Sequence, residues 1–189
     1  ADALAWCRGR NWAWRALLLA YLTSVSYRSL TDPDYWNLFG GITLVVHESG
    51  HIIFAPFGEL IEAAGGSIMQ VATPLIVACV FLRQREYYGI TVALQWLAMS
   101  LATLARYVDD ARSQELQLVS MGSGDPIHDW HFILGRLGML GDDHALAHFT
   151  TFCGWLTLIA SVALGAWLCA AMRHLPAREP TVDEVLGRG

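Results

Sequence analysis

The chain has 189 residues, of which 54% are hydrophobic and only 15% are charged. Soluble domains carry roughly a quarter charged residues, so this composition excludes an ordinary soluble domain and predicts a membrane protein. The net charge of -5 excludes a nucleic-acid-binding protein, because phosphate recognition needs a clustered basic surface.

Hydropathy divides the chain into about five segments long enough to cross the roughly 30 Å of a bilayer core. We expect these spans at 11–30, 38–57, 65–82, 87–105 and 145–172. A short helix is expected at about 130–140, within the polar connection that precedes the last span. A backbone in lipid must satisfy its own polar groups, and spans of this length favour helices. The sequence therefore predicts an all-α, polytopic membrane bundle, a single domain over 1–189 with a flexible tail at 174–189.

The arginines do not indicate the orientation of the chain in the membrane. If every span reverses the direction of the chain, alternate loops place six arginines on each side. The rule that positive loops face the cytoplasm then favours neither orientation.

The second span is apolar except for the run His47–Glu48–Ser49–Gly50–His51. On a helix, His47 and His51 share a face, so both imidazoles can bind one zinc ion. Glu48 can then act as the general base toward the water that zinc activates, as in the HExxH motif of zinc hydrolases. Ionisable groups within a span are costly unless they face a cavity or bind something, which favours a functional site.

A catalytic zinc ion takes a third protein ligand and leaves one position for water. The polar connection offers four candidates in a short run, namely Asp125, His128, Asp129 and His131.

Two motifs together resemble the site-2 protease family of intramembrane zinc metalloproteases. His47–Glu48–Ser49–Gly50–His51, followed by Ala55 and Gly58, is similar to the family's HExGHxxxA pattern. Pro126–Ile127–His128–Asp129 is similar to its proline-x-x-Asp-Gly stretch, although Trp130 stands where the family has glycine and Asp125 stands near the place of a family asparagine. The resemblance covers about 38–140.

The resemblance implies that Asp129 is the third zinc ligand. His131 and then His128 are the alternates, because they lie three residues apart on one helical face. The two histidines can alternatively orient Asp129 without binding the metal. The resemblance also implies one zinc ion per chain and Glu48 as the catalytic base. The reaction that it implies is hydrolysis of peptide bonds in membrane-embedded protein substrates. We expect an integral protein of the bacterial inner membrane whose partners are the lipid bilayer, the substrate and a larger membrane complex, with no nucleic acid.

Two other groups of polar residues are expected to have structural roles. Gly65–Gln70 is expected to form a tight turn, with Gln70 bonded to a neighbouring helix. The alternative is an extended segment in which Gln70 binds the substrate backbone. The four aspartates of the connection are expected to form a solvated face: Asp109, Asp110, Asp142 and Asp143.

Two other function classes stay open. The chain contains three histidine pairs, 47/51, 128/131 and 144/148, which is the kind of spacing found in histidine-box di-iron oxidases and desaturases. Such enzymes use about eight histidines, including adjacent ones, and this chain has seven with no adjacent pair. The third class is a non-catalytic subunit of a membrane complex.

Overall fold

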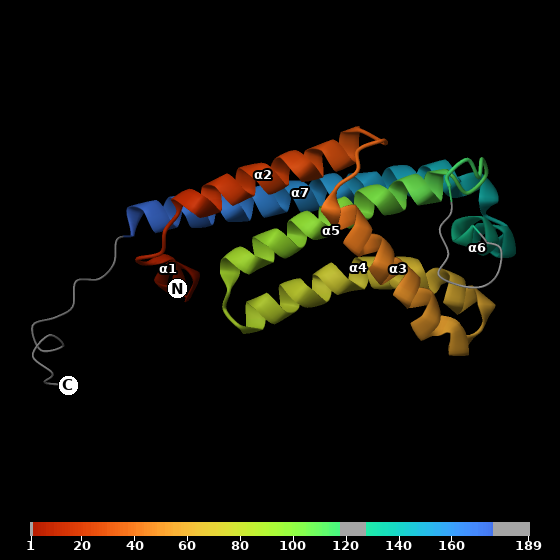
Figure 1. Cartoon of the computed structure of the whole chain (residues 1–189), viewed down its shortest axis with the longest axis horizontal. Coiled ribbons are helices and arrows are strands. Elements are labelled where there is room, and N and C mark those ends of the chain that lie inside the picture. Colours follow the sequence, from red (N-terminus) through yellow and green to blue (C-terminus); the bar gives the residue numbers. More distant parts are fainter. Residues whose placement is uncertain (1, 118–127, 176–189) are drawn as a thin grey trace, which may run out of the picture.

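The computed structural model describes residues 2–117 and 128–175, and Figure 1 shows their arrangement. All regular structure in these two ranges is helical, which confirms the predicted all-α fold. The elements, in chain order, are α1 (Asp2–Cys7), α2 (Ala13–Thr31), α3 (Leu38–Phe54), η1 (Ala55–Phe57), α4 (Glu59–Arg83), α5 (Tyr87–Asp109), α6 (Asp129–Leu137), η2 (Leu140–Asp142) and α7 (Asp143–His174). Asp125, Pro126, Ile127 and nearly all of the expected flexible tail lie outside the described residues.

Four of these helices are long and apolar enough to cross a membrane, and they correspond to the second to fifth predicted spans. They are Leu38–Phe57, Glu59–Arg83, Tyr87–Asp109 and Leu140–His174. The chain is therefore a membrane protein. The first predicted span is the helix α2, which is not among the four because serine, threonine and arginine residues interrupt its apolar side chains.

Helix α5 lies at the centre of the bundle. It packs against α7 and also contacts α2, α3 and α4, and it is the most buried of the four apolar helices. Its buried positions carry small residues that let helices approach closely in a membrane, among them Ala98, Ala102 and Ala105. Hydrogen bonds also join the helices, since Ser26 donates to the Gln95 side chain and Ser161 donates to the Thr91 carbonyl.

Helices α3 and α4 cross at glycine residues. A Cβ atom at Gly50 would lie 2.2 Å from the carbonyl oxygen of Gly65, so a side chain there would force the two helices apart. The expected turn at Gly65–Gln70 is therefore wrong. These residues lie inside α4, which already begins at Glu59, and the glycines permit close helix contact instead of a turn.

One end of the bundle, on the left of Figure 1, is rich in arginine. Contacts join α1, the α4–α5 turn and the end of α7 there, including ion pairs of Arg10 with Glu86 and of Arg85 with Asp2. This arginine end carries six of the ten arginines in the described ranges, namely Arg8, Arg10, Arg15, Arg83, Arg85 and Arg173.

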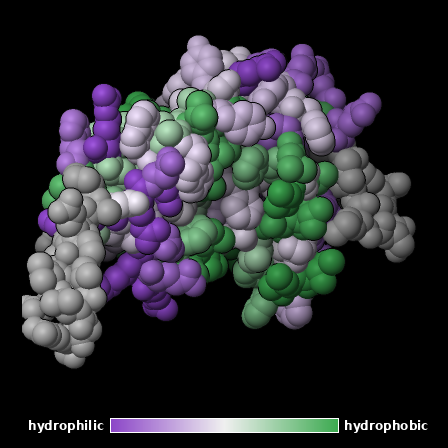
Figure 2. All heavy atoms as spheres, turned by 60° about the vertical axis from the view of Figure 1, so that its left-hand side comes forward, coloured by the Kyte–Doolittle hydropathy of each residue, from purple (hydrophilic) through white to green (hydrophobic). Residues whose placement is uncertain are grey.

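The predicted equal division of arginines between the two sides of the membrane is wrong. Figure 1 shows that α2 and α3 both run toward the end where α6 lies, so the chain does not reverse at every span. In Figure 2, hydrophobic side chains occupy the middle of the view, and hydrophilic ones gather to its left and upper right. This distribution matches a bundle that crosses a membrane.

The structure also corrects the interpretation of the four aspartates. Asp110 and Asp143 are buried and bond to His128 and Arg112, respectively. Only Asp109 and Asp142 are exposed, as expected for a solvated face.

Candidate metal centre

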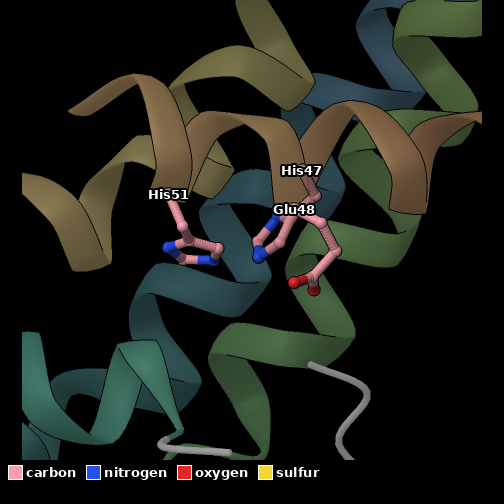
Figure 3. A group of neighbouring side chains, drawn as sticks. All are labelled: His47, Glu48 and His51. Atoms are coloured by element: carbon pink, nitrogen blue, oxygen red, sulfur yellow. The ribbon is translucent and has the colours of Figure 1, made fainter. Parts of the chain in front are cut away.

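His47, Glu48 and His51 lie together on α3. Figure 3 shows their side chains extending to the same side of the helix. One potential ligand atom from each lies within 4.8 Å of the other two, with His47 buried and the other two side chains half-buried. The spacing of four residues produces this arrangement because it brings two side chains onto one helical face. The cluster could hold a metal ion.

Asp129 completes this cluster from a distant part of the sequence. It is the first residue of α6, and its Oδ2 lies 3.2 Å from Nε2 of His47 and 3.3 Å from Nε2 of His51. A tetrahedral zinc ion with bonds of about 2.0–2.1 Å separates neighbouring ligand atoms by about 3.3 Å. The contacts of Asp129 therefore have the spacing of a zinc ligand set, the arrangement that the resemblance implies.

The Nδ1 atom of His47 is held by Gln70. It lies 2.9 Å from Gln70 Oε1, while the Gln70 amide nitrogen donates to the Ser100 carbonyl and to Thr103 Oγ1 on α5. These two donated bonds fix which end of the amide faces His47, so Oε1 accepts and Nδ1 carries the proton. Gln70 thus bonds to a neighbouring helix, as expected, but it also contacts the imidazole instead of lining an extended segment.

His51 is oriented in the same way. Its Nδ1 lies 2.9 Å from the backbone carbonyl oxygen of Glu62 on α4, which can only accept a hydrogen bond. In the neutral imidazole, Nε2 then carries the lone pair, as it does in His47. Both lone pairs are directed at the Asp129 carboxylate.

This arrangement requires a cation or additional protons. A carboxylate oxygen about 3 Å from two imidazole lone pairs would be repelled by both. A metal ion among the three atoms removes this repulsion, and so do additional protons on the imidazole Nε2 atoms or on the carboxylate. A single metal ion satisfies all three groups.

Tyr107, which the sequence analysis missed, also binds Asp129. Its hydroxyl donates to Oδ2 at 3.1 Å and accepts from the Asp129 backbone N–H at 3.0 Å. Its ring packs edge-on against His47, with centroids 5.8 Å apart. The residue lies beyond the predicted end of its span at 105, whereas α5 continues to Asp109. The apolar pattern ends before this helix does, so hydropathy alone could not place Tyr107 beside the cluster.

The alternate ligands His128 and His131 are engaged elsewhere. His128 caps α6 by accepting from the His131 backbone N–H through Nδ1, while its Nε2 lies 3.3 Å from Asp110 Oδ2. His131 Nδ1 lies 2.8 Å from the Ala111 carbonyl. Among the described contacts, Asp129 alone reaches both imidazoles of α3. The two histidines instead join the start of α6 to the end of α5.

Trp130 has a structural role that a glycine could not fill. Its indole N–H donates to Ser67 Oγ on α4 at 3.1 Å. Together with the ion pair of Arg136 and Glu59, this bond attaches α6 to α4. This contact holds Asp129 against α3 and α4.

The third histidine pair does not join the cluster. His144 lies at the start of α7, where its Nδ1 is 2.6 Å from Asp109 Oδ1, and both side chains are exposed. Within residues 2–117 and 128–175, no second group of three metal-binding side chains accompanies the one on α3.

Comparison with protein-family models, with curated proteins and with solved structures gives no match to this chain.

Proposed function

We propose that this membrane protein is a zinc metalloprotease that hydrolyses peptide bonds of membrane-embedded substrates, with His47, His51 and Asp129 as the metal ligands. One observation supports the proposal most strongly. Both imidazoles bond through Nδ1 to fixed acceptors, and both direct Nε2 at the same carboxylate oxygen. This is how metal-binding histidines are held by their surroundings.

Two histidines and one carboxylate match the ligands of catalytic zinc sites that keep a fourth position open. When bound, zinc would act as a Lewis acid that polarises the substrate carbonyl and lowers the pKa of water to about 7. We infer one zinc ion per chain, since the described residues contain one group of three metal-binding side chains, the one on α3.

Glu48 is the proposed general base. It lies next to His47 on α3, its carboxylate is close to both imidazoles, and it is only half-buried. Water and a substrate carbonyl can therefore reach it. Glu48 would accept the proton of the attacking water and deliver it to the leaving amine.

The remaining residues hold this geometry. Gln70 and the Glu62 carbonyl fix the imidazoles, and Tyr107 fixes Asp129 at both its backbone and its carboxylate. Most residues of α3 are exposed or half-buried, so a substrate helix can approach α3 through the lipid. We place the protein in a bacterial inner membrane, alone or within a larger membrane complex.

The experiment that tests this function compares wild type with Glu48→Gln, using zinc-loaded protein in detergent and a fluorescein-labelled transmembrane peptide as the substrate. The variant should keep about one zinc ion per chain and lose cleavage by at least about 100-fold, the usual contribution of a general base. Glu115→Gln is the matched control, because the Glu115 side chain is exposed and lies outside the cluster.

Other outcomes distinguish the competing functions. Cleavage by Glu48→Gln at the wild-type rate would exclude Glu48 as the base. Two iron ions per chain would favour the di-iron oxidase, and bound zinc without cleavage by wild type would favour the non-catalytic subunit.

A further inference from the structure

A groove runs along the outer face of the bundle between α2 and α7, which lie side by side in Figure 1. Its volume is about 760 Å³, and its walls are nearly all apolar. Small side chains form much of the floor, namely Ala16 and Ala20 of α2 and Ala166 and Ala170 of α7. Because α2 and α7 form this outer face, the groove is accessible to lipid.

Polar residues lie at the arginine end of the groove. Trp12, Arg173 and His174 line it there, and the Arg173 guanidinium lies 5.6 Å from the centre of the Trp12 ring. Tryptophan rings are enriched at the level of lipid headgroups. This end of the groove therefore lies at the boundary between acyl chains and headgroups.

The same end is positively charged. Two more arginines lie over tryptophan rings, Arg10 over Trp6 and Arg15 over Trp14, each at 4.2 Å. Of the charged residues in the described ranges, six arginines and two carboxylates lie at the arginine end, giving a local charge of 6 − 2 = +4. The two carboxylates already pair with Arg10 and Arg85. An anionic headgroup would complement this charge.

We propose that the groove between α2 and α7 binds an anionic phospholipid, with an acyl chain along the alanine floor and the phosphate at Arg173. The charge at one end of the groove favours this occupant over a second helix, because Arg173 lines that end and a phosphate complements it. This proposal is independent of the metal centre.

Native mass spectrometry of the full chain in detergent tests the proposal. Phosphatidylglycerol is titrated against phosphatidylcholine with the same acyl chains. Wild type should bind one phosphatidylglycerol in preference to phosphatidylcholine. Arg173→Gln should weaken phosphatidylglycerol binding about fivefold, as expected for one arginine near an anionic headgroup, without changing phosphatidylcholine binding. Ala170→Leu should weaken both by filling the groove.

Arg28→Gln is the matched control, because Arg28 lies at the other end of α2 and should leave both affinities unchanged. Equal affinities for the two lipids in wild type would overturn the proposal. So would an equal effect of Arg28→Gln and Arg173→Gln, which would indicate a nonspecific attraction of charge. A dimer that Ala170→Leu dissociates would overturn it too, since the groove would then bind a second copy of the chain.

Discussion

Gly66 packs directly against the imidazole of His47. A Cβ atom at Gly66 would lie 2.5 Å from Nε2 of His47, closer than non-bonded atoms approach. The absence of a side chain at this position therefore determines where the imidazole can lie. Gly66 belongs to α4 and His47 to α3, so the position of the proposed ligand depends on the close contact of these two helices.

Gly66→Ala should lower zinc affinity by about 10- to 100-fold, the usual effect of changing a residue that supports a metal ligand. The added methyl group must displace the imidazole or separate the helices. Gly41→Ala is the control, because a Cβ atom at Gly41 meets no atom within 4 Å. Competition with a chelator measures both affinities. Equal values for wild type and Gly66→Ala would show that Nε2 of His47 does not bind the metal.

Gln70→Leu should also weaken zinc binding by about 10- to 100-fold. The leucine cannot accept the hydrogen bond from His47 Nδ1, so the imidazole loses the contact that presents Nε2 to the metal. The same chelator competition applies, with the exposed Gln84→Leu on the turn after α4 as the control. If Gln70 instead binds the substrate backbone, zinc affinity should stay unchanged and only the KM of cleavage should rise.

Asp129→Asn should reduce bound zinc far more than His128→Asn. The first change replaces the charged ligand by a neutral amide. The second keeps a side chain that can cap α6, since asparagine can accept from the His131 backbone N–H as His128 does. Zinc content after dialysis measures both. A greater loss of zinc in His128→Asn than in Asp129→Asn would mean that Asp129 is wrongly assigned as the third ligand.

Asp110→Asn should destabilise the fold in a manner that depends on pH. Burial raises the pKa of Asp110, but hydrogen bonds from Ser113 and from the backbone N–H groups of Glu115 and Leu116, with the nearby His128, outweigh burial and lower it. A group with a lowered pKa contributes stability above its unfolded value, and this stability is lost as the pH falls through the folded pKa.

Thermal unfolding in detergent at several pH values checks this prediction. Asp110→Asn should lower stability by about 1.5–3 kcal/mol at neutral pH, the range for hydrogen bonds to a charged group. The difference from wild type should shrink below about pH 4, the ordinary aspartate value. Asp142→Asn, an exposed aspartate, is the control. A difference that stays constant down to pH 2 would exclude this role of the carboxylate.

Hydropathy predicted the helices well because apolar runs of membrane length have few alternatives to a helix. It located the four apolar helices and the short α6. The HExxH pattern likewise placed His47, Glu48 and His51 on one face, since that follows from the helical period alone. The prediction that Asp129 joins this cluster came from the resemblance to a family, and the spacing of residues in the sequence did not indicate it.

Other features depend on contacts between helices, which the sequence does not show. Glycine at 65 and 66 is equally consistent with a turn and with a close helix contact, and the turn was the wrong choice. Asp110 and Tyr107 follow the apolar run of the fourth span, so composition assigned Asp110 to solvent and gave Tyr107 no role. Their functions become apparent only once α5 and α6 are packed together.

The zinc content of the detergent-purified protein, measured by elemental analysis in wild type and in His47→Ala, tests the central claim most directly. The proposed site predicts about one zinc ion per chain in wild type and nearly none in the variant, because one of three ligands is removed. Zinc retained in full by His47→Ala, or no zinc in wild type after reconstitution, would contradict the assignment of His47, His51 and Asp129 as a zinc centre.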